Sequence, residues 1–193
     1  MSATTAIIWL VYLHAILSGY RRQRRATIII TATGHGLNAR CFVANLGLEP
    51  VNVLGVVIDS ELDGVKRRTD IAELNGSAED STQISKSIPH GPLTSGAYAD
   101  IGTFKQLCGL TQPSDDHPRP NEGEIIVTVI ATTAADSYLA GAKRTFFIEA
   151  ADEGGPPYLR ADSAQTKQIR SRAGRRQLES ALGCYNDDHQ TRF

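Results

Sequence analysis

The sequence VNVLGVVIDSELDGVKRRTD, residues 51–70, indicates how this chain folds. Residues 51–59 are rich in β-branched side chains, which favour extended strands. The Asp63-Gly64 pair is typical of a two-residue hairpin turn, because both positions tolerate a positive φ angle. Residues 65–73 then supply the returning strand. This stretch therefore predicts an antiparallel β-hairpin.

Further strand-like segments occupy most of the chain on both sides of this hairpin. They are separated by turn residues at short intervals, and no helical pattern lies between them. About seven to eight strands without intervening helices predict a mainly β domain, an immunoglobulin-like antiparallel β-sandwich, with an open barrel as the alternative. The expected strands are residues 26–33, 39–45, 51–59, 65–73, 83–88, 98–104, 124–133 and 143–150.

An apolar segment without formal charge, residues 3–20, precedes these strands. As a helix of about 18 residues it would be roughly 27 Å long, close to the thickness of a bilayer core. Tyr20 lies where an interfacial aromatic residue is expected, and an arginine-rich stretch follows it directly. We therefore expect an N-terminal transmembrane helix. Its polar members, Thr4, Thr5, His14 and Ser18, make it less apolar than a typical span.

Three other interpretations of the apolar segment are compatible with its length. A signal peptide would carry positive charge before the apolar run and a small-residue cleavage site after it, unlike this segment. A buried core helix would use the strongest apolar stretch, residues 6–17, but would leave the following arginines without a purpose. A proton-carrying role for His14 would require an acidic partner that the segment lacks.

Arginines on only one side of the segment predict its orientation. By the positive-inside rule, the four that follow it keep the C-terminal side in the cytoplasm. We thus expect a single-pass membrane protein with its β-domain on the cytoplasmic side. Cys41, Cys108 and Cys184 lie far apart without a CxxC motif, which is typical of free thiols in a reducing compartment rather than of a disulfide framework.

Charge is distributed unevenly, although the formal net charge is only −1. Counting Lys and Arg against Asp and Glu gives +4 for residues 1–25, −8 for 26–156 and +3 for 157–193. An acidic body argues against a nucleic-acid-binding core, so no nucleic-acid partner is expected. The expected divisions are a membrane anchor with an arginine-rich juxtamembrane stretch (1–25), a β-sandwich domain (26–160), a basic helix (161–183) and a flexible tail (184–193).

The expected basic helix provides most of the candidate site. Asp162 or Ser163 would cap its start, and Gly183 would end it. Together with the N-terminal arginines, its charges are expected to contact an anionic membrane surface, each contributing about 1 kcal/mol. The alternative is a solvated helix whose charges serve only solubility. The candidate membrane-surface residues are Arg21, Arg22, Arg24, Arg25, Lys167, Arg170, Arg172, Arg175 and Arg176.

Two motifs approach known ligand sites without satisfying their chemistry. Gly34-His35-Gly36 follows a strand, but it lacks the third glycine and the helix of a dinucleotide-binding turn, so a glycine-turn hairpin is favoured. Residues 59–70 approach a calcium loop, but residues 66–68 would place three positive charges in the cation site. A hairpin with surface carboxylates is again favoured.

The histidines do not lie in a catalytic motif. No GxSxG or comparable setting joins a Ser or Cys nucleophile to His35, His90 or His117, all of which lie in expected loops. Residues 115–117, Asp-Asp-His, are expected to be solvated loop charge rather than a metal site. We therefore expect no cofactor, no metal and no enzyme activity.

The chain resembles uncharacterised bacterial proteins that combine an N-terminal anchor, an arginine-rich juxtamembrane stretch and a β-sandwich domain. The residues that carry the resemblance are YRRQRRA (20–26), ANLGLEPV (44–51) and GAKRTFF (141–147). The resemblance covers most of the chain. It implies the fold and the location, and it transfers no site.

These observations support three functional hypotheses. The first is a membrane-tethered, non-enzymatic interaction or scaffolding protein that binds a protein partner of unknown identity. The second is an accessory subunit of a membrane complex, in which His14, Ala15, Ser18 and Gly19 form a helix–helix contact. The third is a membrane-bound hydrolase, which requires two of the loop histidines to converge near an acid.

Overall fold

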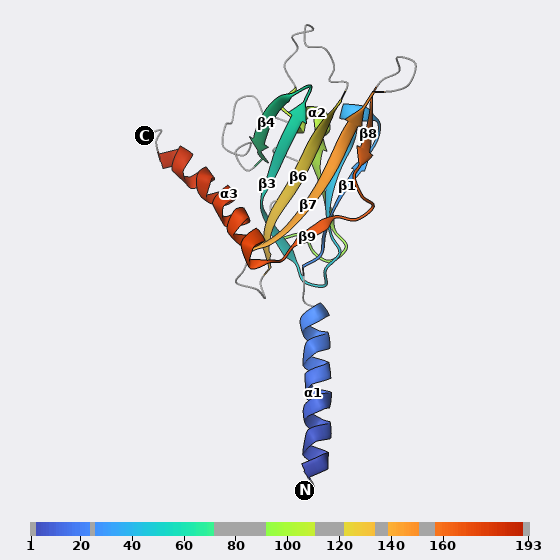
Figure 1. The fold of residues 1–193 in the computed structure, drawn as a ribbon, viewed down its shortest axis with the longest axis vertical. Helices are drawn as coiled ribbons and strands as arrows, with labels where there is room; N and C mark the ends of the chain where they lie inside the picture. Colours follow the sequence, from blue (N-terminus) through green and yellow to red (C-terminus); the bar gives the residue numbers. More distant parts are fainter. Residues whose placement is uncertain are drawn as a thin grey trace.

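The computed structural model describes residues 3–23, 26–71, 92–110, 122–133, 139–150 and 157–190. Strands dominate, with one helix near each end of the chain (Figure 1). In chain order the elements are α1 (Ala3–Gln23), β1 (Ile28–Thr33), the 3₁₀ helix η1 (Gly36–Asn38), β2 (Arg40–Asn45), β3 (Val51–Leu62), β4 (Val65–Asp70), β5 (Tyr98–Thr103), α2 (Phe104–Leu107), β6 (Gly123–Thr133), β7 (Ala140–Glu149), β8 (Tyr158–Ala161), β9 (Lys167–Ile169) and α3 (Arg172–Gln190).

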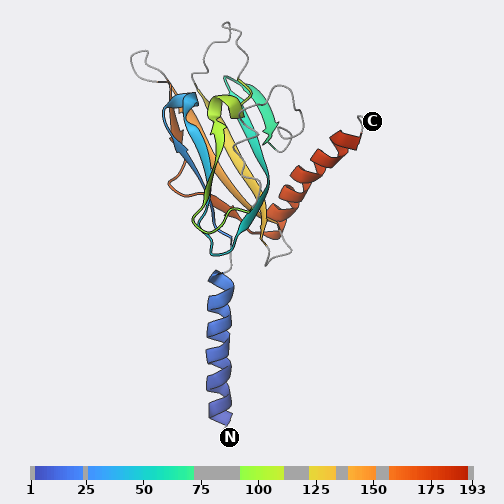
Figure 2. The same ribbon diagram turned by 180° about the vertical axis from the view of Figure 1, so that it is seen from behind.

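The strands form two antiparallel sheets that pack face to face (Figures 1 and 2). One sheet has the order β1-β2-β5. The other has the order β4-β3-β6-β7-β8, with β9 paired to the opposite end of β7 from β8. The prediction of a mainly β chain with antiparallel sheets, consistent with a β-sandwich, is confirmed.

Alternation of side chains along the strands produces the core between the sheets. On β6, Ile125, Val127 and Val129 are fully buried, whereas Ile126 and Thr128 between them face outward and are only half-buried. The Phe104 and Phe146 rings meet edge to face at 4.9 Å, which joins the short helix after β5 to β7.

The hairpin expected at residues 51–73 forms as predicted over the part that is described. Asp63 and Gly64 have φ angles of 46° and 78°, as a two-residue turn requires, and Leu62 pairs with Val65. The near-calcium motif is therefore a hairpin. The strand expected at residues 83–88 lies outside the described residues.

Side chains rather than a strand cover the outer edge of β1. Gln168 Nε2 donates to the Ile28 carbonyl oxygen at 2.6 Å, and its Oε1 accepts from the Ile28 N–H at 3.2 Å. The Ile30 N–H donates to Thr166 Oγ1 at 3.0 Å, and Arg144 Nη1 donates to the Ile30 carbonyl oxygen. These bonds link the edge of one sheet to β7 and β9 of the other.

The structure corrects the prediction of a basic helix starting near residue 161. Residues 158–161 and 167–169 are strands, and α3 begins only at Arg172 and continues past Gly183. The reason is that the Thr166 and Gln168 side chains bond the edge of β1, which holds this segment extended. Ser171 caps the helix instead, since its Oγ accepts from the Gly174 N–H at 3.0 Å.

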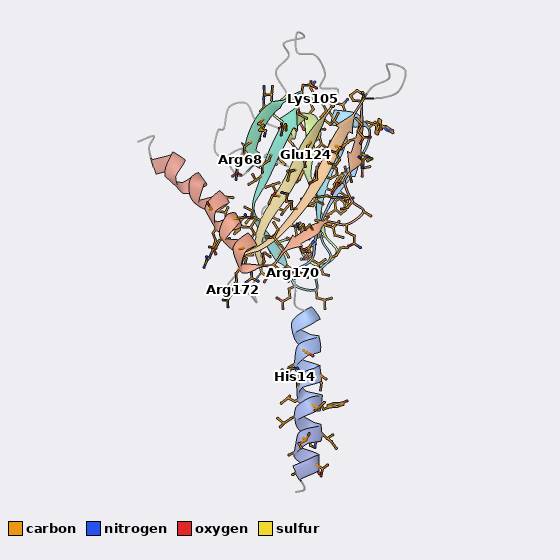
Figure 3. All side chains as sticks on the ribbon, viewed as in Figure 1. His14, Arg68, Lys105, Glu124, Arg170 and Arg172 are labelled. Carbon is orange, nitrogen blue, oxygen red and sulfur yellow. The ribbon has the colours of Figure 1, made fainter. Side chains whose placement is uncertain are left out.

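The N-terminal helix forms as expected, but its membrane assignment is wrong. α1 points away from the sandwich, and its large apolar side chains between Ile7 and Leu17 are 46–66% exposed (Figures 1 and 3). Among the described residues, no helix has the length and apolar character needed to cross a membrane. The strongest apolar stretch, residues 6–17, is about 12 residues and gives only about 18 Å, against a bilayer core of about 30 Å. A single-pass membrane protein is therefore not supported.

Candidate interaction surface

The structure brings the C-terminal basic segment next to the start of β1, far from it in the sequence. Arg170 Nη2 donates to the carbonyl oxygen of Ala26, directly after the N-terminal arginines, at 3.1 Å. Figure 3 shows Arg170 and Arg172 at the end of the sandwich that faces α1. Arg21 and Arg22 lie in the last turn of α1, whereas Arg24 and Arg25 lie outside the described residues. We call this end of the sandwich the α1 end.

The first part of α3 is fixed to the outer face of the larger sheet. Leu178 is 3% exposed and packs with Val57 and Ile130 in a small apolar cluster. With Leu178 held against the sheet, Arg172 and Arg176 remain exposed, as does Lys167 on β9, whereas Arg175 is half-buried. The assignment of these residues to a membrane surface stays a prediction.

A rigid loop between β2 and β3 presents two leucines at the α1 end. Leu46 and Leu48 are 57% and 65% exposed. The Leu46 N–H donates to the Thr27 carbonyl oxygen at 2.8 Å, which places the loop beside the start of β1. One short loop beside the start of β1 therefore exposes two leucine side chains.

Asn45 at the end of β2 holds this loop in place from inside the protein. Its side chain is fully buried, and Nδ2 donates to the carbonyl oxygens of Glu49 and Leu93 at 2.8 and 2.9 Å. Its Oδ1 accepts from the Gly47 N–H at 2.9 Å. Such Asx-type bonding explains why Asn precedes the turn. The strands expected at residues 39–45 and 51–59 imply a turn here, but nothing in the sequence showed that its leucines would point outward.

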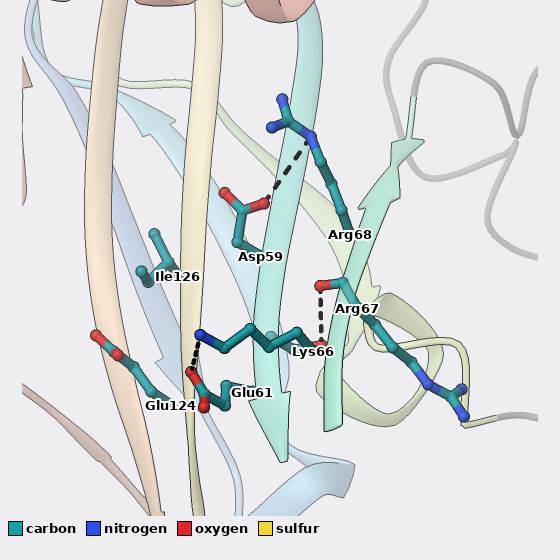
Figure 4. A pocket seen from close by; sticks show the side chains of 8 residues that line it. Asp59, Glu61, Lys66, Arg67, Arg68, Glu124 and Ile126 are labelled. Atoms are coloured by element: carbon teal, nitrogen blue, oxygen red, sulfur yellow. Dashed lines mark hydrogen bonds and ion pairs between the residues drawn. The ribbon is translucent and has the colours of Figure 1, made fainter. Parts of the chain in front are cut away.

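A second charged surface lies on the outer face of β3, β4 and β6. Cross-strand pairs join Lys66 to Glu61 at 3.3 Å and Arg68 to Asp59 at 3.9 Å, beside a shallow cavity of about 320 Å³ (Figure 4). Ile126 lines the cavity between these charges. The positive side chains lie where a calcium ion would need oxygen ligands.

Metal and acid–base chemistry gain no support from the described part of the chain. Within it, no three His, Cys, Asp or Glu side chains gather closely enough to hold a metal ion. His35 is exposed in the loop before η1, whereas His90 and His117, with Asp115 and Asp116, lie outside the described residues. The histidine convergence that a hydrolase requires therefore stays a prediction.

The two described cysteines are buried thiols. Burial raises the pKa of Cys41 to about 12, with a smaller contribution from the Asp100 carboxylate. Burial also raises the pKa of Cys108 to about 11, partly offset by its hydrogen bond with Ser60. Because the thiolate is the nucleophile, both residues are poor candidates for covalent catalysis.

Comparison with protein-family models, with curated proteins and with solved structures finds no match to this chain.

Proposed function

We propose that this chain is a non-enzymatic protein-interaction module whose contact surface is the α1 end of the sandwich. The observation that carries the proposal is the bond between the Arg170 side chain and the Ala26 carbonyl oxygen, which holds the basic segment before α3 beside the start of β1. The exposed Leu46 and Leu48 lie at the same end. The proposed surface thus offers both apolar and charged side chains, the two kinds that protein interfaces combine.

The leucine loop supports the proposal because it is ordered without a partner. Ordering a loop on binding costs free energy that reduces affinity. Here the three hydrogen bonds of the buried Asn45 already hold the loop. Both leucines are thus available as anchors that fill pockets on a partner, while exposed basic residues around them bind its acidic side chains.

We further propose that the sandwich belongs to the immunoglobulin-like class. Two antiparallel sheets with alternating buried residues, and strands joined partly by hairpins, support this assignment. The order of the first sheet, β1-β2-β5, includes a crossover from the larger sheet, as in Greek-key folds.

A subunit role in a larger assembly is the second candidate, and the exposure of α1 favours it. Trp9, Leu10 and Val11 are each at least 65% exposed, and the consecutive apolar residues at positions 6–13 point to all sides of α1. A helix that is apolar all round is normally buried by neighbours. Partner helices would contact it through the small residues Ala15, Ser18 and Gly19, beside His14.

The test of the main proposal uses the full-length chain and a displayed library of random linear peptides. We expect enrichment of peptides that combine acidic and apolar residues. A synthetic copy of an enriched peptide should bind at least about tenfold more weakly to a Leu46→Ser/Leu48→Ser variant, and also to Arg172→Glu. Val65→Ser is the matched control, since Val65 is 55% exposed at the opposite end of the sandwich.

Two results would contradict the proposal. One is a library that yields no enriched sequence. The other is an enriched peptide that binds the leucine variant as tightly as the parent chain. The subunit role is tested separately with Trp9→Lys, which should abolish any concentration-dependent association of α1 and leave peptide binding unchanged.

A further inference from the structure

β4 is an edge strand of the larger sheet. It pairs with β3 along its whole length, from Val65 to Asp70, and no strand of the described residues pairs with its other side. Exposed edges of this kind attract extended segments from other chains, because their backbone N–H and C=O groups lack strand partners.

The hairpin register tells which backbone groups point outward. Leu62 and Val65 flank the two-residue turn and form a hydrogen-bonded pair. Opposite residues alternate between bonded and non-bonded pairs in an antiparallel ladder. The backbone N–H and C=O groups of Val65, Arg67 and Thr69 therefore bond to β3. The same groups of Lys66 and Arg68 point away from β3.

Three consecutive cationic side chains follow this edge. Lys66 and Arg68 reach back across β3 toward Glu61 and Asp59, yet their side chains remain 78% and 55% exposed. Arg67 points away from these carboxylates (Figure 4). No carboxylate among the described residues forms an ion pair with Arg67. Exposed pairs of this kind contribute little and exchange readily, so the edge can offer its charge to a partner.

The simplest alternative to partner binding is that the three cationic side chains only protect the edge, since charged residues on edge strands discourage aggregation. The other sheet shows how this chain closes an edge: Gln168, Thr166 and Arg144 bond the outward groups of Ile28 and Ile30 on β1. No bond of this kind reaches the outward groups of Lys66 and Arg68 within the described part of the chain. The cationic side chains repel basic strands and attract acidic ones.

We propose that the free edge of β4 is a docking site for an extended acidic segment of a partner protein. The segment adds to the sheet as a further strand through the outward groups of Lys66 and Arg68. A carboxylate facing Arg67 gains the strongest contact, because no carboxylate of the described chain competes for that guanidinium. This site is separate from the α1 end and does not depend on the function proposed above.

The test uses the full-length chain and a short, end-blocked, fluorescent peptide of alternating valine and glutamate. Two comparison peptides replace glutamate by glutamine or carry N-methyl groups on alternate backbone nitrogens. At low ionic strength, the glutamate peptide should bind at least about tenfold more tightly than either. It should also slow amide hydrogen exchange at Lys66 and Arg68 more than at Arg67 and Thr69.

Protein variants separate this edge from general electrostatics. Arg67→Glu should weaken binding by at least about tenfold, and the milder Arg67→Gln should weaken it less. Lys105→Glu is the matched control. Lys105 is an exposed cation on α2, the short helix directly after β5 of the smaller sheet, and not on β4 (Figure 3). The proposal is overturned if the N-methylated peptide binds as well as the parent, if glutamine replaces glutamate without loss, or if Lys105→Glu weakens binding as much as Arg67→Glu.

Discussion

Leu178 of α3 occupies the space in front of Gly141 of β7. A Cβ atom added at Gly141 would lie 2.5 Å from Leu178 Cδ1 and 3.3 Å from Ile169 Cβ. Because Leu178 is buried against Val57 and Ile130, it has little room to move aside. The absence of a side chain at Gly141 is thus what allows α3 to pack on the sheet.

Gly141→Ala should therefore destabilise the protein by about 1–3 kcal/mol, as overpacking does in cores. Urea unfolding of the full chain measures this change. The double variant Gly141→Ala/Leu178→Ala removes the clash and should be less destabilised than the sum of the two single variants. Simple additivity would show that Gly141 and Leu178 do not interact in this way.

Asn45→Ala should destabilise the fold by about 2–4 kcal/mol, because it removes three hydrogen bonds, to Glu49, Leu93 and Gly47, and leaves a cavity at a fully buried position. Asn45→Asp keeps the acceptor for the Gly47 N–H but loses both N–H donors. At neutral pH its stability should therefore be equal to or lower than that of the alanine variant. Thermal unfolding measures both. A change below about 0.5 kcal/mol for both would mean that Asn45 does not hold the leucine loop.

Gln168→Ala should open the edge of β1. It removes both bonds to Ile28, with an expected loss of about 1–3 kcal/mol. Amide exchange at Ile28 should become faster, whereas exchange at Val43 on the central strand β2 should follow only the global loss of stability. Unchanged exchange at Ile28 would show that the backbone of β1 is protected in another way.

The buried thiols predict slow chemical modification. Since burial raises the pKa of Cys41 to about 12 and of Cys108 to about 11, few of these thiols are ionised at pH 8. Iodoacetamide followed by peptide mass spectrometry should leave both unmodified in the folded chain and alkylate both in denaturant. Rapid alkylation of Cys41 or Cys108 in the folded state would contradict their burial.

The same thiols predict a loss of stability in alkali. Their folded-state pKa values lie above the ordinary value of 9.0, so the unfolded chain releases these protons first as the pH rises. The contribution of the two protonated thiols to the free energy of unfolding is complete below about pH 9. It declines between pH 9 and about pH 11 to 12. Cys108→Ala should show a shallower decline in the free energy of unfolding than the parent chain over this range.

Much of the sheet could be predicted because strand signals are local. The run 124–133 became β6 with only its first residue shifted, and the Asp63-Gly64 turn formed as its chemistry requires. β-Branched residues and turn glycines act over a few positions, so they can be read without knowledge of the rest of the fold. The short strands β8 and β9 were missed because they carry no such pattern.

The C-terminal part shows where local patterns fail. Residues 163–171 have good helix formers, but contacts with β1, more than 130 residues earlier in the chain, hold Thr166 and Gln168 extended. The meeting of Arg170 with Ala26 depends on the same long-range contacts. The basic residues of the candidate site could therefore be named from the sequence, whereas the position of Arg170 beside the start of β1 could not.

Covering β1 with side chains also limits how copies of this chain can assemble. A filament built by strand addition needs two open ends on the same sheet, one to accept a neighbour and one to offer itself. In the sheet β1-β2-β5, the end at β1 is occupied by Gln168, Thr166 and Arg144. Strand addition at β5 therefore cannot continue from copy to copy through β1 of the same sheet.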